Sequence, residues 1–406
     1  MQEAILISIT GMDRPGITAS VTQVLAEFDV NVLDIGQSVI HDALSLGMLV
    51  QIPAELTDGQ AVIAAIQKVM DELNLTVRFV NINRESYEHW VRQQGKGRHI
   101  VTLLARRITA HHISRLARIV ADHGLNIDKI TRLSGRVSLE SIHNGGQACV
   151  EFSLRGPVTD LPMLRREFME LADEIGVDIA YQEDNVYRRN RRLVAFDMDS
   201  TLLQAEVIDE LAKRAGVGTE VAKITERAMQ GELDFRASLL QRVTLLKGLP
   251  ESALAEVAAT LNLTEGTERL IATLKKLGYK TAILSGGFTY FGRALQRRFG
   301  FDYVFANDLE IESGLITGRL ASEIVDGERK ATLLASIARH EGFSLEQTIA
   351  VGDGANDLPM LSIAGLGIAF NAKPTVKESA KQSLNTLGLD GILYLMGLSE
   401  KDTQAQ

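Results

Sequence analysis

Apolar and polar residues follow different patterns in the two halves of the chain. Residues 1–192 hold two copies of one order of elements, and each copy predicts a strand, a helix, two strands, a second helix and a last strand. In the first copy the predicted strands cover 5–10, 30–40, 44–52 and 76–82, and the predicted helices cover 17–28 and 57–73. This βαββαβ order is typical of a ferredoxin-like domain with its helices on one face of the sheet.

The second copy repeats this order further along the chain. LAEFDVNVLDI begins at Leu25 and VADHGLNIDKI begins at Val120, so the offset is 120 − 25 = 95 residues, and it also aligns the first strands, 5–10 and 100–105. Here the predicted strands cover 99–106, 126–135, 146–156 and 177–182, and the predicted helices cover 112–124 and 159–176. Polar stretches at 83–98 and 183–192 follow the copies. We therefore expect two small domains, at 1–84 and 98–184.

The pattern changes from Leu193 onward. Short apolar runs end in Gly, Asp or Ser and lead into helical patterns, as in RRLVAFD, YKTAILSGG, QTIAVGDG and GLGIAF. This alternation predicts an α/β domain over 190–400, with a doubly wound parallel sheet and helices on both faces. The long segment 205–272 has a helical period and predicts a separate helical cap over the strand ends.

Composition excludes several classes of partner. The chain has 406 residues, enough for two or three domains, and its formal net charge of −9 argues against nucleic-acid binding. No apolar run approaches the roughly 18 residues that span a bilayer, and the N-terminal segment MQEAILISIT does not resemble a signal peptide. With a single cysteine, Cys149, neither an intrachain disulfide nor a cysteine-rich zinc cluster can form. We expect a cytoplasmic protein without a nucleic-acid or membrane partner.

Polar residues gather where the predicted strands of the C-terminal half end. Ligands of open parallel sheets bind beyond the carboxyl ends of the strands, so these residues are expected to share one site. The candidates, in chain order, are Asp197 and Asp199, then Ser285, Gly286 and Gly287, then Lys330 at the start of a helical run, and then Asp353, Asn356 and Asp357.

Carboxylates that converge in this way repel one another unless a cation lies between them. Oxygen ligands favour a hard divalent cation, most simply Mg²⁺. One carboxylate could then attack phosphorus while another, two residues on, exchanges protons with the leaving oxygen and water. Ser285 and Lys330 could hold the phosphoryl oxygens. Taken singly, each motif has a simpler explanation as a helix cap, a turn or a surface lysine, but four in order favour a catalytic site.

The segments DMDST, ILSGGF and GDGANDLPM, together with Lys330, resemble the four motifs of haloacid-dehalogenase-superfamily phosphatases. The resemblance covers most of 193–395, and within the superfamily it is closest to the phosphoserine phosphatases. It implies Mg²⁺-dependent hydrolysis of O-phospho-L-serine to L-serine and phosphate, the last step of serine biosynthesis, through an aspartyl-phosphate intermediate.

The resemblance also implies a role for each motif residue. Asp197 would be the nucleophile and Asp199 the general acid and base. The metal would be held by the Asp197 side chain, the Asp199 backbone carbonyl and Asp353, with Asp357 supporting them. Asn356 would position phosphate or a metal-bound water. Thr201 and Ser200 would satisfy the hydrogen-bonding groups of the turn and the second oxygen of the nucleophile.

The predicted cap would contribute the residues that select the substrate. By the same resemblance, Glu206 would bind the substrate ammonium and Arg242 its carboxylate, while Met229 and Phe235 would line the pocket. Arginine suits this part because its guanidinium binds a carboxylate through two parallel hydrogen bonds.

Both N-terminal copies resemble ACT domains, regulatory modules that bind amino acids at a paired interface. In the first copy, GMDRPGI (11–17) resembles the ligand-binding loop of these domains. The resemblance implies that Asp13, Gly16 and, further along the chain, Asn31 contact an amino-acid effector, and that the chain is a homodimer. ACT domains more often carry Asn where this chain has Asp13. The second copy has His111 in place of Gly16, so it is expected to lack the site. Dimerisation without any ligand is the alternative.

Three other functions are compatible with these residues. Asp197 could pass the phosphoryl group to another hydroxyl acceptor, such as homoserine, or the substrate could be another small phosphomonoester. The chain could also be a non-enzymatic amino-acid sensor, although a sensor would gain nothing from the pair of Asp197 and Asp199.

Overall fold

The computed structural model describes residues 4–53, 59–93, 97–136, 138, 140 and 146–404. The chain forms two compact units, Met1–Lys96 and Gly97–Gln406. None of the helices in the described ranges has both the length and the apolar character that crossing a membrane requires.

The first unit has the ferredoxin-like fold that its pattern predicts. Its elements are β1 (Ala4–Met12), α1 (Ile17–Glu27), β2 (Asn31–Ile40), β3 (Ala43–Gln51), α2 (Gln60–Glu72), β4 (Thr76–Ile82) and α3 (Arg84–Gln93). The antiparallel sheet has the order β2-β3-β1-β4, so β2 lies at an edge. Alternate residues of β1, namely Ile5, Ile7 and Ile9, join one core cluster with residues of α1 and α2. The polar stretch after this copy forms α3, a helix that its residue pattern does not predict.

The second unit begins with the second copy of this fold. Its elements are β5 (Arg98–Ala105), α4 (Ala110–Asp122), β6 (Asn126–Arg132), β7 (Ala148–Arg155), α5 (Leu161–Ile175) and β8 (Asp178–Glu183), and the sheet order is β6-β7-β5-β8. The face of β5 packed with α4 and α5 carries Val101, Leu103 and Ala105. These residues correspond to Ile5, Ile7 and Ile9 at an offset of 96 (101 − 5 = 96), so the expected offset of 95 is wrong for the first strand. One residue of slip would turn every side chain to the opposite face.

The other face of this second sheet is covered as well. Leu104, Cys149 and Ala180 point away from α4 and α5 and join the core cluster of the C-terminal domain. Beside them Thr102 and Glu151 are buried, and Glu151 forms an ion pair with the buried side chain of Arg188. The second copy is therefore a middle layer and not a free module.

A run of reciprocal hydrogen bonds joins β8 to β16 (Gln382–Leu384), the edge strand of the C-terminal sheet. The Tyr181 backbone N–H donates to Gln382 Oε1 over 2.9 Å, and Gln382 Nε2 donates to the Tyr181 carbonyl. The buried Asp178 carboxylate accepts the backbone N–H groups of Asn385 and Thr386 at 2.9 and 2.7 Å. We call this contact the β8–β16 seam.

The C-terminal domain is built on the parallel sheet that the sequence predicts. Its order is β11-β10-β9-β14-β15-β16, formed by β9 (Leu193–Phe196), β10 (Lys280–Phe288), β11 (Tyr303–Asn307), β14 (Thr348–Gly352), β15 (Leu366–Phe370) and β16. Residues of β9 alternate between two cores: Val194 and Phe196 face one side of the sheet, and Leu193 and Ala195 face the other. Strands buried on both faces explain the continuous apolar runs.

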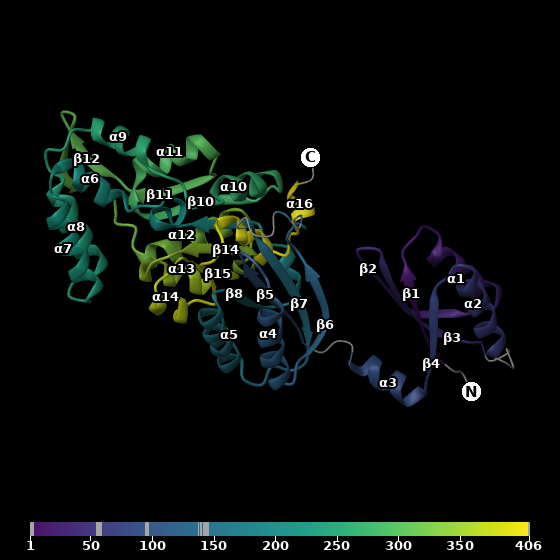
Figure 1. Cartoon of the computed structure of the whole chain (residues 1–406). Coiled ribbons are helices and arrows are strands. Elements are labelled where there is room, and N and C mark those ends of the chain that lie inside the picture. The colour runs from purple at the N-terminus through teal and green to yellow at the C-terminus, as the bar shows by residue number, and fades with distance from the viewer. Residues whose placement is uncertain are drawn as a thin grey trace. The chain divides into compact units, whose positions relative to one another are not determined.

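Helices cover both faces of this sheet (Figure 1). One core includes α10 (Thr267–Lys276), α11 (Thr289–Phe299) and α15 (Ile392–Leu395), and the other includes α12 (Gly327–His340), α13 (Leu358–Ile363) and α14 (Pro374–Ser379). The chain ends with α16 (Glu400–Gln404).

The segment 205–272, expected to be a cap, holds α6 (Val207–Ala215), α7 (Gly218–Met229), α8 (Phe235–Leu245), α9 (Ser252–Thr260) and the start of α10. A hairpin of β12 (Leu309–Glu312) and β13 (Leu315–Leu320) joins these helices near α8 and α9 (Figure 1). A backbone hydrogen bond links the hairpin to the segment after α8: the Gly248 N–H donates to the Ile316 carbonyl over 2.8 Å. This hairpin is an addition to the elements that the sequence predicts.

Candidate active site

Asp197 and Asp199 lie in a sharp turn at the carboxyl end of β9. The Asp197 N–H donates to the Val351 carbonyl of β14 over 2.8 Å, which continues the ladder one residue beyond the strand. The chain then turns through Met198–Leu202, where Ser200 has a φ of 56°, in the left-handed region. Asp197 and Asp199 are both buried there, at 5% and 7% exposure.

Lys330 is fully buried and forms ion pairs with two of the aspartates. Its Nζ lies 2.9 Å from Asp197 Oδ1 and 2.7 Å from Asp357 Oδ1. Burial alone lowers the pKa of a lysine, but the charges of Asp197 and Asp357 outweigh it and raise the pKa of Lys330. Lys330 therefore carries a buried positive charge between these two carboxylates and is not a lysine on a solvated helix face.

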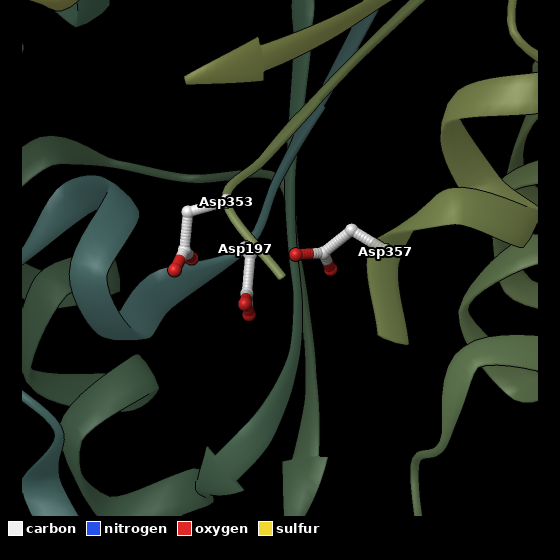
Figure 2. Close-up of side chains that lie close together, drawn as sticks. All are labelled: Asp197, Asp353 and Asp357. Atoms are coloured by element: carbon white, nitrogen blue, oxygen red, sulfur yellow. The ribbon is translucent and has the colours of Figure 1, made fainter. Parts of the chain in front are cut away.

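The carboxyl groups of Asp197, Asp353 and Asp357 converge, and their candidate ligand atoms all lie within 4.8 Å of one another. Figure 2 shows the three side chains, with Asp353 and Asp357 on the segment that follows β14 and the Asp357 carboxyl pointing towards Asp197. Burial and the charge of Asp357 raise the pKa of Asp197 to about 7, and burial with the charges of Asp197 and Asp357 raises that of Asp353 to about 8. Lys330 thus does not neutralise the cluster, and its all-oxygen donor set fits a divalent cation.

The hydrogen bonds within the cluster distinguish its members. Asp357 uses both oxygens inside the protein, since Oδ1 accepts from Lys330 and Oδ2 accepts from the Gly354 N–H at 3.0 Å. The bonds described for Asp197 end on Oδ1, where the Met198 N–H also donates. Thr201 donates to Asp353 Oδ1 over 3.2 Å. Asp197 and Asp353 are therefore better placed than Asp357 to offer an oxygen to a cation.

Two glycines after β10's apolar run allow other groups to approach the backbone. A Cβ on Gly287 would lie 2.5 Å from Asp199 Oδ2, and a Cβ on Gly286 would lie 2.6 Å from the Phe235 ring. The buried Ser285 hydroxyl accepts the Gly287 N–H at 2.9 Å, within the irregular end of β10 (285–287) that we call the glycine loop. This segment therefore lies directly against both Asp199 and the cap. It belongs to the end of β10, whereas the sequence predicts that it follows the strand.

The cap residues expected to bind substrate lie near this turn. Glu206 Oε1 accepts the Ser200 hydroxyl at 3.0 Å, and Arg242, on α8, is 9% exposed. Arg236 of α8 forms an ion pair with Asp326 at the start of α12, which is a second contact between the cap and the core. Asn356 is half-buried beside Asp357, whereas the side chain of Met229 lies outside the described part of the chain.

The motifs match known families in the expected order. Residues 3–80 and 97–182 match ACT domain families, and residues 194–362 match the haloacid dehalogenase-like hydrolases. The phosphoserine phosphatase of Streptomyces coelicolor is 42% identical over 401 residues, which cover 99% of this chain and 94% of that protein. That of Mycobacterium tuberculosis is 41% identical over 404 residues, 99% of this chain and 95% of that protein. The chain belongs to the phosphoserine phosphatase family.

Two solved structures share the fold of this phosphatase. A HAD family hydrolase from Salmonella enterica serovar Typhi has a TM-score of 0.63 and 31% identity, over 73% of this chain and 98% of that one. A probable phosphoserine phosphatase from Vibrio cholerae has a TM-score of 0.59 and 34% identity, over 75% of this chain and 88% of that one.

The three residues expected to bind an ACT effector do not meet within one copy of the phosphatase. Asp13 donates its N–H to the Asp42 carbonyl, at the end of the sheet where Met12 pairs with Ala43. Asn31 pairs with Gln51 at the opposite end, beside the start of β1. Nine residue steps along β2 separate these ends, or about 30 Å at 3.3 Å per residue. Asp13 and Gly16 share a loop, but Asn31 is remote from it.

Three polar residues of the phosphatase escaped the sequence analysis. Asn307, at the end of β11, donates to the Gly286 carbonyl over 2.7 Å and accepts the Val325 N–H at 2.8 Å, so it fixes the glycine loop. Its place after a short apolar run was the available signal. Asp209 and Ser238 lie in the cap with Glu206 and Arg242, and only the fold shows that their side-chain oxygens are buried.

Proposed function

We propose that this phosphatase hydrolyses O-phospho-L-serine to L-serine and phosphate, as the last step of serine biosynthesis, and that its cation is Mg²⁺. The proposal rests on how Asp197 is held. Lys330 binds its Oδ1, and no described hydrogen bond ends on its Oδ2, so this oxygen could act as the nucleophile. Glu206 and Arg242 on the cap support a substrate that is both an amine and a carboxylic acid. A cytoplasmic location stays a prediction.

The proposed reaction has two steps. Asp197 Oδ2 attacks phosphorus, the ester bond to the serine oxygen breaks, and Asp199 gives that oxygen its proton. Asp199 then takes a proton from a water molecule, whose oxygen attacks the phosphorus of the aspartyl phosphate and releases phosphate from Asp197. Lys330, Ser285, Asn356 and the N–H groups of the glycine loop hold the phosphoryl oxygens, and Thr201 holds Asp353.

In this proposal Asp197, Asp353 and the Asp199 backbone carbonyl would hold Mg²⁺, and Asp357 would support them through Lys330 and Gly354. A bound Mg²⁺ would offset the negative charge of the phosphoryl oxygens. Burial and the neighbouring carboxylates raise the pKa values of Asp197 and Asp353, and a cation at this position would offset both effects.

Phosphate release from O-phospho-L-serine should require added Mg²⁺ and should stop when a chelator is present. The physical reason is the repulsion among the three clustered carboxylates of Asp197, Asp353 and Asp357 and a dianionic substrate. The measurement is phosphate release with and without chelator, beside a panel of other phosphomonoesters. Preference for another ester would refute the roles of Glu206 and Arg242. If no ester released phosphate, transfer to an acceptor such as homoserine, or a sensor without catalysis, would replace this proposal.

We also propose that the first copy binds an amino-acid effector, such as serine, between two subunits of a homodimer. Antiparallel pairing of two β2 edges would place Asn31 of each copy against the end of the partner's β2, where the loop of Asp13 and Gly16 lies. Val32 and Ile35 on β2 are 46% and 48% exposed in one copy, and apolar side chains so exposed on an edge strand support a partner subunit that covers them. Dimerisation would thus unite the three residues that one copy keeps apart.

Ile35→Lys should convert the dimer into a monomer and abolish serine binding together, because a charge would be buried at the centre of the paired edge. Light scattering would measure the mass, and calorimetry would measure serine binding. Ile130→Lys is the matched control, since Ile130 is the equivalent residue of β6 (130 − 35 = 95) and is 53% exposed. Serine binding by a monomeric Ile35→Lys variant would contradict the shared site.

A further inference from the structure

Three buried polar atoms in the cap have no hydrogen-bond partner among the described residues. They are Asp209 Oδ1, Ser238 Oγ and Arg242 Nε. Ser238 is 2% exposed and Arg242 is 9% exposed. A buried polar group left without a partner destabilises the fold, so three of them in the cap indicate that a ligand supplies the missing partners.

All three atoms belong to helix surfaces that face the phosphoryl-binding turn. On α8, Phe235, Ser238 and Arg242 are spaced by three and four residues and share one side of the helix. That side points to the glycine loop, because the Phe235 ring lies against Gly286. On the neighbouring helix, Asp209 follows Glu206 by three residues, so both carboxylates lie on one side of the start of α6.

Electrostatics supports the same grouping. Burial raises the pKa values of Glu206 and Asp209 above their usual range. The charge of Arg242 offsets part of this increase for both carboxyls, which places the guanidinium near each of them. Glu206 already accepts a hydrogen bond from Ser200. An ammonium group has three N–H donors, and in a closed pocket each needs an acceptor. In Glu206, Oε1 already accepts from Ser200, so a second carboxylate nearby would help to satisfy the three donors.

The geometry points to Asp209 as a second acceptor for the ammonium group of the substrate, beside Glu206. Asp209 is then a residue that determines specificity for an amino acid ester, while Arg242, helped by the Ser238 hydroxyl, takes the substrate carboxylate. The inference rests on the proposed hydrolysis of phosphoserine and adds to it the group that selects an amine.

The test compares two esters that differ only in the amine: O-phospho-L-serine and 3-phosphooxypropanoate. For Asp209→Asn, the ratio of kcat/KM for the first ester to that for the second should fall about ten- to a hundredfold, the range for losing one charged hydrogen bond. Most of the fall should appear as a raised KM for phosphoserine. Glu206→Gln should lower the same ratio.

Glu210→Gln is the matched control, because Glu210 is the next residue on α6 and pairs with Lys213 instead. Its ratio should equal that of the unchanged enzyme. Asp209→Glu keeps the charge and should retain part of the preference, which gives a second measurement if Asp209→Asn does not fold. An unchanged ratio in Asp209→Asn, or equal losses on both esters, would overturn the inference alone. No phosphate release from either ester by the unchanged enzyme would overturn the proposed function as well.

Discussion

Asp197→Asn is expected to lower kcat for phosphoserine by at least about a thousandfold, the scale of loss when a covalent nucleophile is removed. The amide has nearly the shape of the carboxylate, and Lys330 keeps its second ion pair, with Asp357 at 2.7 Å. The fold should therefore survive while turnover does not. Phosphate release in the steady state, with circular dichroism for the fold, would measure both.

Asp308→Asn is the control for this substitution, because it makes the same chemical change at an exposed position of the same domain. Its kcat should be unchanged. Asp197→Asn should still bind phosphoserine, since Arg242 and Glu206 are untouched. If Asp197→Asn kept more than a few per cent of kcat, the nucleophile would have to be another group.

Lys330→Met should lower the free energy of unfolding by about 3–5 kcal/mol, the usual effect of removing one partner from a buried ion pair. It leaves Asp197 and Asp357 facing each other without the ammonium that lies 2.9 and 2.7 Å from them. Turnover should fall as well, because the phosphoryl group loses a buried cation. Urea denaturation in the presence of a chelator would measure the stability without compensation by a metal.

A second substitution separates charge from packing. Adding Asp357→Asn to Lys330→Met removes one of the two stranded charges, so the double variant should be more stable than Lys330→Met alone. Lys223→Met, at an exposed position of α7, should leave the stability unchanged. If the double variant were less stable than Lys330→Met, packing of the lysine chain and not its charge would explain the loss.

The sequence predicts the larger elements of the fold because their periods are long and clear. It fails where tertiary contacts decide. The first strands of the two copies align at 96 and not at 95 residues, since both faces of β5 are buried and its apolar run no longer shows which face is inward. The hairpin of β12 and β13 alternates Leu309, Glu310, Ile311 and Glu312 before a Ser-Gly turn, a signal that is present but short.

The candidate site likewise has residues that the sequence could place and residues that only the fold could place. Residues at strand ends, such as Asp197 and Asp353, could be placed together because parallel strands end at one edge. Their partners could not, since the burial of Lys330 between two aspartates depends on how α12 packs. Asp209 has the spacing of any exposed helix residue, and only the fold brings it near the charge of Arg242 on α8. For the first copy, the sequence names Asp13, Gly16 and Asn31, but only the strand register shows that Asn31 lies at the opposite end of the sheet from the other two.

The β8–β16 seam has a consequence for how such chains can be recombined. A chimaera cut near residue 184 would separate Tyr181 from Gln382 and Asp178 from its two backbone donors, and would bare a sheet face that carries Leu104, Cys149 and Ala180. A cut between residues 96 and 97 crosses none of these bonds and falls at the boundary of the two units. The exchangeable module is therefore the first copy alone, and the second copy is inherited with the catalytic sheet whose edge strand it holds.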